Sequence, residues 1–218
     1  MGFDFAVVVP YLGSLFQGAV WTVIVTCAGG ALSLAGGVVF AVAALYAPWP
    51  VRWGIKGFLW LFRGTPLLLQ LFLIYFGLVE IGIDLDAFAA GILGLGLHYA
   101  TYNADVIQAG ILAVDRGQME AGRTLGLSQG QTLRKIIVPQ ALRDMAPPLG
   151  NNMIALLKDS ALVSVIGVAE LTLSAQLAIS QTFRPFEFYA TAGVFYYVIN
   201  LGLEAILGRI ERRTQVAR

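Results

Sequence analysis

The feature that most constrains this chain is an uncharged run, because no charged residue occurs from Phe5 to Val51. A helix that crosses the hydrocarbon core of a bilayer needs about 20 largely apolar residues, and this run exceeds that length. Over all 218 residues, 58% are hydrophobic and only 12% are charged. A soluble domain carries about 25% charged residues. The sequence therefore predicts an all-α integral membrane protein.

Five transmembrane helices are expected, at residues 15–45, 56–79, 87–114, 150–172 and 188–208, with a long connection at 115–149. The first apolar run can also be read as two helices that break at its glycine pairs, Gly29-Gly30 and Gly36-Gly37. That alternative is disfavoured because it moves the N-terminus to the cytoplasm. Residues 1–51 contain no Lys or Arg to hold it there.

Basic residues collect after the first, third and fifth predicted helices. They are Arg52 and Lys56, then Arg116, Arg123, Arg134, Lys135 and Arg143, then Arg209, Arg212, Arg213 and Arg218. The connection after the second helix holds only acidic residues (Glu80, Asp84 and Asp86) and no base. Cytoplasmic loops are enriched in Lys and Arg. We therefore expect a multi-pass protein of the bacterial cell inner membrane, with the N-terminus outside and the C-terminus in the cytoplasm.

The sequence argues against an enzyme. The single Cys27 allows neither an intrachain disulfide nor a multi-cysteine metal site. The single His98 lies in an apolar helix, where a lone histidine is most often packed and bonded to a neighbour. No nucleophile with its base, phosphate-binding loop or paired carboxylates is evident, so we expect no catalytic, cofactor or metal site. The start of the chain lacks the basic segment of a cleavable signal peptide.

The connection at 115–149 contains two helix-start patterns. Asp115 and Gln118 have the spacing of a capping box, and so do Ser128 and Gln131. Gly126, between them, supplies the left-handed residue that commonly ends a helix. These patterns predict a helical hairpin at the cytoplasmic surface.

Prolines set the expected end of this hairpin. Pro139 is expected to interrupt its second helix, and Pro147-Pro148 to mark the return to the membrane. The hairpin is either an amphipathic connector that rests on lipid headgroups or a docking element for a cytoplasmic partner. Docking explains more of the sequence, because a short helix with a tight glycine turn fits a groove.

Four segments resemble the permease subunits of ATP-binding cassette (ABC) importers. The sequence Glu120-Ala121-Gly122, followed by Gly126 and then by Ile136-Ile137-Val138-Pro139, is similar to the EAA signature of that family. Gly122 replaces the second alanine of the signature, and Val138 replaces a leucine. The segments at 63–70, 150–152 and 158–167 resemble the polar amino acid subfamily, which covers histidine, glutamine, glutamate, arginine and opines.

This resemblance implies a type I ABC importer permease, with residues 1–218 as one transmembrane domain and a coupling-helix hairpin. The chain would pair with a second permease chain, identical or homologous, to import a polar or charged amino acid. Two cytoplasmic ATPase subunits would bind ATP and Mg²⁺, and an extracytoplasmic binding protein would deliver the amino acid. The residues that the resemblance assigns to ATPase coupling are Glu120, Ala121, Gly122, Arg123, Thr124, Gly126 and Pro139.

Polar residues within the predicted helices are candidates for the substrate pathway, because ionisable groups at bilayer depth usually face the bundle interior. These candidates are Thr65, Gln70, His98, Tyr102, Asp105, Lys158, Asp159, Ser160 and Ser164. A helix kink or local unwinding at Thr65 and Pro66 is the alternative to substrate contact there. Glu80 and Glu170 are expected near the outer rim, where the binding protein would dock.

The neighbouring charges Lys158 and Asp159 point in different directions on a helix, so each is expected to pair with another helix. Arg63 and Asp105 are their candidate partners in a structural or gate-closing ion pair. Two other functions are considered for the whole chain. One is a structural membrane subunit of a larger complex. The other is an ion-coupled secondary carrier, a class that usually shows internal repeats and more helices than this chain offers.

Overall fold

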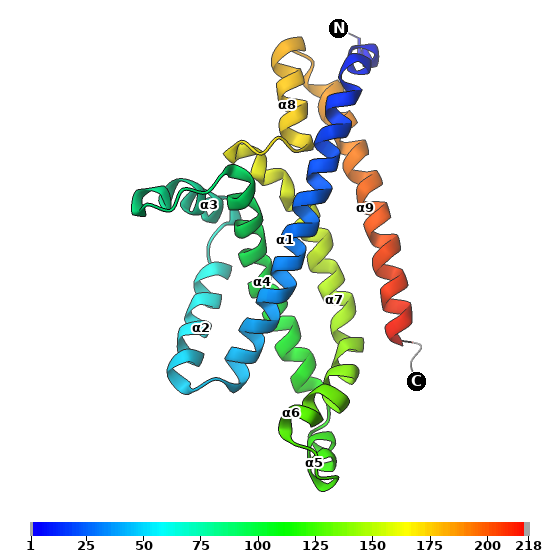
Figure 1. Cartoon of the computed structure of the whole chain (residues 1–218). Helices are drawn as coiled ribbons and strands as arrows, with labels where there is room; N and C mark the ends of the chain where they lie inside the picture. Colours follow the sequence, from blue (N-terminus) through cyan, green and yellow to red (C-terminus); the bar gives the residue numbers. More distant parts are fainter. Residues whose placement is uncertain (1, 216–218) are drawn as a thin grey trace.

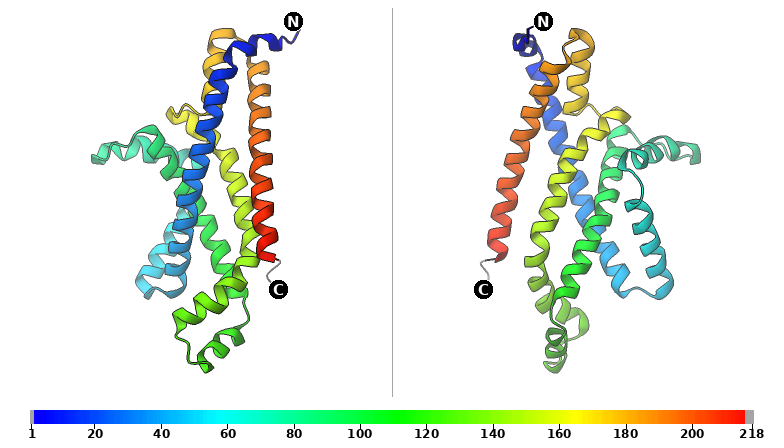
Figure 2. Two further views of the ribbon diagram at one scale, coloured as in Figure 1. Left: turned by 45° about the vertical axis from the view of Figure 1, so that its right-hand side comes forward. Right: turned by 180° about the vertical axis from the view of Figure 1, so that it is seen from behind.

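The computed structural model describes residues 2–215, and four long helices run side by side along one axis (Figure 1). They are α1 (Leu12–Tyr46), α4 (Ala87–Ala113), α7 (Val138–Asp159) and α9 (Pro185–Gln215). α2 (Trp49–Arg63) stands beside them at one end of the bundle. The described chain begins and ends at opposite ends of the bundle, as an odd number of crossings requires (Figure 2).

Shorter helical segments complete the described part of the chain. They are η1 (Phe5–Tyr11), α3 (Leu67–Phe72), η2 (Leu73–Gly77), η3 (Val79–Ile81), α5 (Arg116–Thr124), α6 (Gln129–Thr132), η4 (Leu133–Ile137), η5 (Ser160–Ile166) and α8 (Leu171–Thr182). α5 and α6 project beyond the end of the bundle that holds the C-terminus, and α8 lies at the other end (Figure 1). α3 and the turns after it leave the bundle sideways.

The helices are long and apolar enough for a membrane protein. Three runs, Phe5–Tyr46, Gln129–Ile166 and Pro185–Thr214, are able to cross a bilayer by length and composition, and α2 with α3 makes a fourth if the bent pair is one crossing. α4 is not among these runs because its second half carries several polar residues, but it packs against both α1 and α7. The all-helical prediction with about five membrane helices agrees with this arrangement.

The first predicted helix is one helix, α1, and the alternative of two helices broken at the glycine pairs is not found. The glycines instead allow α1 and α4 to approach closely. A Cβ atom added at Gly37 would lie 2.7 Å from the Cβ of Asn103, and one added at Gly96 would lie 2.5 Å from a methyl group of Leu32. Small residues at a helix crossing are a standard means of packing helices in membranes.

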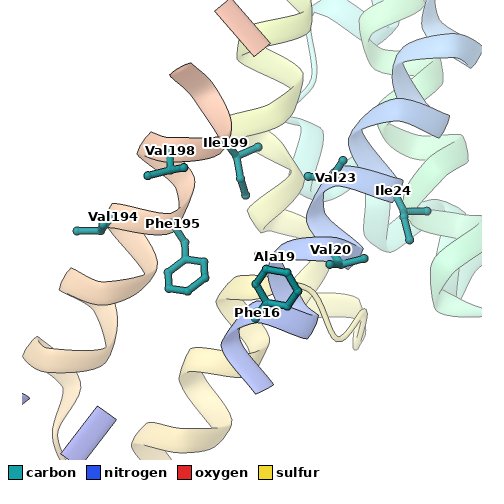
Figure 3. Close-up of a pocket in the computed structure, with 9 residues that line it drawn as sticks. All are labelled: Phe16, Ala19, Val20, Val23, Ile24, Val194, Phe195, Val198 and Ile199. Atoms are coloured by element: carbon teal, nitrogen blue, oxygen red, sulfur yellow. The ribbon is translucent and has the colours of Figure 1, made fainter. Parts of the chain in front are cut away.

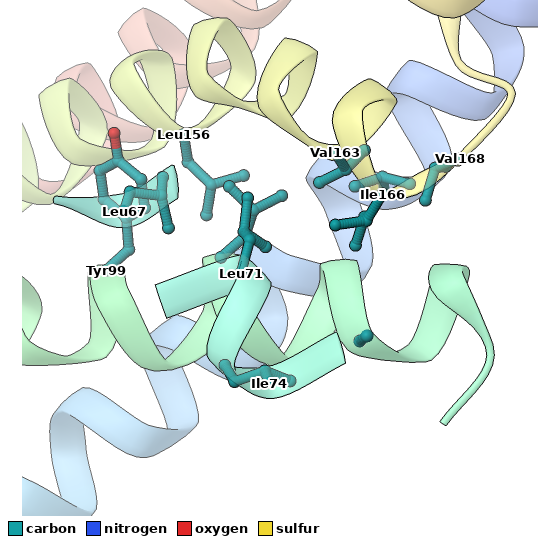
Figure 4. Close-up of a cluster of buried hydrophobic side chains, with 11 residues drawn as sticks. Leu67, Leu71, Ile74, Tyr99, Leu156, Val163, Ile166 and Val168 are labelled. Atoms are coloured by element: carbon teal, nitrogen blue, oxygen red, sulfur yellow. The ribbon is translucent and has the colours of Figure 1, made fainter. Parts of the chain in front are cut away.

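Three apolar clusters fill the bundle. The central cluster lies between α3, α4, α7 and η5 and includes the fully buried Leu71, Leu95 and Leu156 (Figure 4). A second cluster joins α1, α8 and α9 around Phe188, and a third joins α1, α2, α4 and α7 around Leu59. The outward faces of α1, α2 and α9 expose many large apolar side chains, as expected for contact with lipid.

The prediction of one continuous helix at 56–79 is wrong. α2 begins earlier, at Trp49, and ends at Arg63, and the following run, Leu67–Ile81, turns away from it by 110°. The break has a local cause, because Pro66 lacks an N–H group and disfavours helical conformation at the residue before it. The kink considered at Thr65 and Pro66 is therefore present.

The predicted interruption at Pro139 and the predicted helix start at residue 150 are also wrong. Helical structure continues from Gln129 to Ile166. Pro139 lies in the first turn of α7, after the widened turn η4, and Pro147 and Pro148 lie inside α7. Proline is tolerated inside membrane helices because neighbouring helices and local adjustments satisfy the freed carbonyl groups.

The fourth predicted helix, 150–172, also ends too late. The helical run stops at Gly167, which has a left-handed backbone (φ 92°), and the chain then enters the separate helix α8. The bounds of α4 agree closely with the range expected at 87–114. α1 and α9 extend by a few residues beyond the ranges expected at 15–45 and 188–208.

Candidate functional site

The hairpin beyond the end of the bundle is built by local signals in the sequence. Asp115 caps α5, as predicted, by accepting a backbone hydrogen bond. α5 ends with two paired hydrogen bonds, from Gly126 N to Arg123 O (2.9 Å) and from Leu127 N to Gly122 O (3.0 Å). Gly126 is left-handed (φ 75°), so the predicted helix end at this glycine is confirmed.

The second helix of the hairpin begins with the predicted capping box. Ser128 N donates to Gln131 Oε1 (2.9 Å), and Gln131 N donates to Ser128 Oγ (3.3 Å). Gln118 does not complete the other predicted box. It accepts a hydrogen bond from Gln140 Nε2 on α7 (3.3 Å), which ties α5 to the bundle.

Gly122 is the buried residue of α5, and it packs against the fully buried Thr132 of α6. A Cβ atom at position 122 would lie 2.4 Å from Thr132 Cγ2 and 2.6 Å from its Oγ1. The Thr132 hydroxyl is held in place because it donates to Ser128 O (3.0 Å). Thr132 therefore explains why glycine, and not the alanine of the EAA signature, occupies position 122.

The remaining coupling candidates divide into two groups. Those exposed on the hairpin are Glu120, Ala121, Arg123, Thr124 and Gly126. Glu120 and Arg123 line a hollow of about 470 Å³ between α5 and the ends of α1 and α4 that lie next to the hairpin. Pro139 is exposed on α7 and is absent from the lining of this hollow.

Gln70 braces the break between α2 and α3. Its Nε2 donates to Phe62 O (2.6 Å) and to Thr65 Oγ1 (2.9 Å). In an unbroken helix the carbonyl of Phe62 would accept from residue 66, but Pro66 has no N–H group, so the Gln70 amide takes its place. Gln70 Oε1 lies 2.9 Å from His98 Nδ1, which must carry the proton because the amide oxygen only accepts.

His98 is buried, as expected of a packed histidine, and it belongs to a row of rings on α4. Its ring centroid lies 5.3 Å from that of Tyr99 and 5.1 Å from that of Tyr102. The Tyr99 hydroxyl donates to Asp159 Oδ2 on α7 (2.6 Å), and Figure 4 shows this hydroxyl pointing toward α7. The structure thus brings Thr65, Gln70, His98, Tyr102 and Asp159 into one polar strip.

The predicted partners of Lys158 and Asp159 are wrong. Arg63 pairs with Asp105 instead, because the end of α2 lies beside α4 at the break. Asp159 faces α4, where it accepts from Tyr99, whereas Lys158 is exposed and forms no ion pair with any residue in 2–215. Consecutive helical residues point about 100° apart, so the two charges serve different surfaces.

Lys158 lines a second polar region between α7 and α9, a hollow of about 470 Å³ that also includes Tyr196, Tyr197 and Asn200. This region is separate from the strip at Gln70 and His98. Ser160 and Ser164 join neither group. Both are buried, and their hydroxyls donate to carbonyl oxygens of their own helical run.

Glu170 was expected near the outer rim as a contact for the binding protein, and this expectation is wrong for its side chain. It is fully buried and caps α8 by accepting from Thr172 N and Leu173 N, both at 2.9 Å. It also accepts from the hydroxyls of Tyr196 (2.7 Å) and Thr22 (3.3 Å). Its carboxylate therefore joins α1, α8 and α9, and it is not available to a docking protein. Glu80, in contrast, is exposed.

A second polar junction crosses the bundle at the glycine contact of α1 and α4. Asn152 Nδ2 on α7 donates to Asn103 Oδ1 (2.9 Å), and Asn103 Nδ2 donates to Ser33 Oγ (3.1 Å). The motif at 150–152 thus contributes a link between three helices. Within residues 2–215, no group of three or more His, Cys, Asp or Glu side chains is placed to hold a metal ion.

Comparison with known proteins identifies a family for this fold. Residues 33–216 match the family described as "Binding-protein-dependent transport system inner membrane component". The chain is 38% identical over 218 residues to the glutamine transport system permease protein GlnP of Escherichia coli (strain K12), covering 99% of this chain and 100% of GlnP. It is 34% identical over 214 residues to the arginine transport system permease protein ArtQ of Bacillus subtilis (strain 168), covering 98% of each chain.

A solved structure agrees. The crystal structure of an amino acid ABC transporter with histidines matches with a TM-score of 0.89 and 38% identity, covering 98% of this chain and 100% of the other. Residues, fold and relatives lead to the same conclusion: this chain is a transport subunit of the inner membrane, and it belongs to the family of binding-protein-dependent transport system inner membrane components, among the amino acid ABC importer permeases.

Proposed function

We propose that residues 1–218 form a single permease domain, and that two such chains, identical or homologous, enclose the pathway of an importer for a polar or charged amino acid. The observation that carries this proposal is the α5–α6 hairpin, which projects beyond the bundle and exposes Glu120 and Arg123. The named relatives are permeases for glutamine and for arginine, which supports an amino acid as the substrate.

The hairpin docks into a groove on a cytoplasmic ATPase subunit, one for each permease chain. These partner subunits bind ATP and Mg²⁺, and closure of the ATPase pair moves the hairpins. The continuous helical run from Gln129 to Ile166 supports this mechanism, because it connects the hairpin directly to the outer end of α7. A rigid-body rotation of this kind is a standard way to switch a membrane protein between two states.

The hairpin end of the bundle is the cytoplasmic end, and the N-terminus lies outside. Arg209, Arg212 and Arg213 support this orientation, because they lie at the same end as the hairpin (Figure 2) and basic residues favour the cytoplasm. Arg218 lies outside the described residues. An extracytoplasmic binding protein delivers the amino acid at the opposite end, near α8 and η1.

The amino acid passes between the two polar regions of the bundle. Lys158 is the cation that attracts its carboxylate, because it is exposed in a hollow and has no ion-pair partner among residues 2–215. Asp159, Tyr99 and Tyr102 supply acceptors for its ammonium group on the α4 side. Arg63 and Asp105 act as a gate or structural pair beside them.

The test compares Gly126→Val with Gly126→Asn in the complete transporter. A side chain at position 126 meets nothing within 4 Å, so any effect comes from the left-handed backbone and not from a clash. Asparagine adopts this conformation readily, whereas a β-branched residue does not. We expect both variants to insert in the membrane, with ATP-driven uptake lost in Gly126→Val and retained in Gly126→Asn.

Two results would contradict the proposal. Full uptake by Gly126→Val in an assembled complex would indicate that the hairpin does not couple to ATP and would favour a structural subunit. Uptake in vesicles without the ATPase subunits, driven by an ion gradient, would indicate a secondary carrier.

A further inference from the structure

α9 has two faces of opposite character. One face carries polar side chains, among them Tyr197, Asn200 and Glu204, and Asn200 donates to Glu204 within this face (2.7 Å). The opposite face carries Val194, Val198, Gly202 and Ile206 at four-residue spacing. Polar and charged groups at bilayer depth avoid lipid. The polar face therefore belongs to the protein interior of the assembled transporter, which leaves the apolar face toward the lipid.

An apolar groove runs along that second face, between α9 and the helices α1 and α7. Figure 3 shows its outer part, a hollow of about 440 Å³ lined only by apolar residues of α1 and α9, among them Phe16, Val23 and Ile199. A second hollow of about 280 Å³ shares Val23 and Ile199 with the first and includes Met153 of α7. A third, of about 200 Å³, shares Met153 and reaches Thr214.

The dimensions of the groove match those of a membrane. Its three hollows follow α9 from Val194 to Thr214, which is about 30 Å at 1.5 Å per residue. The hydrocarbon core of a bilayer is also about 30 Å thick. Gly202 widens the groove near its middle, because it has no side chain and a Cβ atom there would meet nothing within 4 Å.

Two arginines lie on the same helical face at the inner end of the groove. Arg209 and Arg213 follow Gly202 and Ile206 by seven residues each, which is close to two helical turns. Both side chains are exposed, and no ion pair within residues 2–215 includes either of them. Neither arginine lines the third hollow, but both lie beside its end on α9. The groove thus has largely apolar walls and two bases next to its inner end, which is complementary to an anionic lipid.

We propose that this groove binds one anionic phospholipid of the inner leaflet, with an acyl chain along Gly202 and Ile206 and the phosphate at Arg209 and Arg213. The assignment to the inner leaflet rests on the orientation given under the proposed function. A second permease chain is the less suitable occupant, because it would leave the polar face of α9 toward lipid. The lipid would hold α9 at a fixed distance from α1 along the part where the two helices are not in direct contact.

Binding is measured by native mass spectrometry on the purified transporter, released from detergent after titration with phosphatidylglycerol or phosphatidylcholine. We expect one phosphatidylglycerol per permease chain. Gly202→Phe, which fills the groove without a backbone clash, should abolish this binding, and the milder Gly202→Leu should weaken it. Gly57→Phe is the matched control, because a Cβ atom at Gly57 also meets nothing within 4 Å and this residue lies on α2. It should bind as the unmodified protein does.

The headgroup contact is tested by the pair Arg209→Gln and Arg213→Gln. A basic residue near an anionic lipid is worth about 1 kcal/mol, so removal of both should lower phosphatidylglycerol affinity about 30-fold. Phosphatidylcholine binding should not change. The control pair Arg52→Gln and Lys56→Gln removes two bases from α2 and should leave phosphatidylglycerol affinity unchanged.

The proposal is overturned if Gly202→Phe and Gly202→Leu keep full phosphatidylglycerol binding, or if the arginine pair and its control have equal effects. It is also overturned if Gly202→Phe separates the two permease chains, since the groove would then hold a protein. Lipid binding is measured without ATP or amino acid, so a failure of the transport proposal is seen separately, in the uptake assay.

Discussion

Replacing Gly122 by alanine should damage the hairpin, although two simple arguments favour the change. Alanine stabilises a helix interior by about 1 kcal/mol relative to glycine, and alanine is the residue of the EAA signature at this position. The new Cβ, however, would lie 2.4 Å from Thr132 Cγ2 and 3.0 Å from Thr132 Cβ. Thr132 is fully buried and its hydroxyl is bonded to Ser128, so it cannot rotate away without losing that bond.

The magnitude follows from these opposing effects. Overpacking a filled site costs about 1–3 kcal/mol, and the gain in helix propensity offsets about 1 kcal/mol. We expect the hairpin to lose about 1 kcal/mol, which is roughly fivefold in its local opening equilibrium. α5 has nine residues and is too short to be stable without its packing against α6. The loss should therefore appear in the hairpin and not in the bundle.

Hydrogen exchange of the α5 and α6 amides in the assembled transporter measures this loss, alongside ATP-driven uptake. Gly122→Ala should exchange about five times faster in the hairpin, with unchanged exchange in α4. Thr132→Ala removes the two atoms nearest to the new Cβ. The double variant should therefore lose less stability than the two single variants lose in sum. Unchanged or slower exchange in Gly122→Ala, or strictly additive effects, would refute the packing argument.

Two further predictions concern the break between α2 and α3. Gln70→Leu leaves the Phe62 carbonyl and His98 Nδ1 without their partner, which should cost about 1–3 kcal/mol and lower the thermal unfolding temperature, whereas Leu69→Ala at the exposed neighbouring site should not. Equal unfolding temperatures for the two variants would contradict the bracing role. Asp105→Arg should reduce uptake by placing two cations together, and adding Arg63→Asp should restore part of it. Because the pair is one third to one half exposed, its effect on stability should stay below about 1 kcal/mol, so uptake is the decisive measurement.

Local signals in the sequence predicted much of the hairpin and the helical class. The capping residues Asp115 and Ser128 and the left-handed Gly126 act through bonds to near neighbours, so their roles could be read from spacing alone. The uncharged run of α1 likewise predicts a membrane helix without reference to the other helices. Its glycine pairs do not break the helix but allow close contact with α4 and α7.

The errors concern residues whose role depends on distant partners. Pro139 and Pro66 are chemically alike, yet the helix continues through the first and breaks at the second, where Gln70 replaces the lost hydrogen bond. The ion-pair partner of Arg63 was wrong because the sequence indicates a kink at Pro66 but not its angle of 110°, which places Arg63 beside Asp105. Glu170 was expected near the surface because an isolated glutamate usually lies there. Two of its four donors are local to α8, and only the fold supplies the other two, the hydroxyls of Thr22 and Tyr196.

The uninterrupted helical run from Gln129 to Ile166 has a mechanical consequence. Its α-helical part, α7, has 22 residues and is about 33 Å long at 1.5 Å each. A tilt of about 10° around the end at the hairpin would displace the opposite end of α7 by roughly 6 Å, which is comparable to the width of an amino acid. A small error in the angle through which the ATPase moves the hairpin would likewise become a larger displacement at the opposite end of the helix. Stiffness in the hairpin, and therefore the fit of Gly122 against Thr132, determines how faithfully an ATPase movement is reproduced on the far side of the membrane.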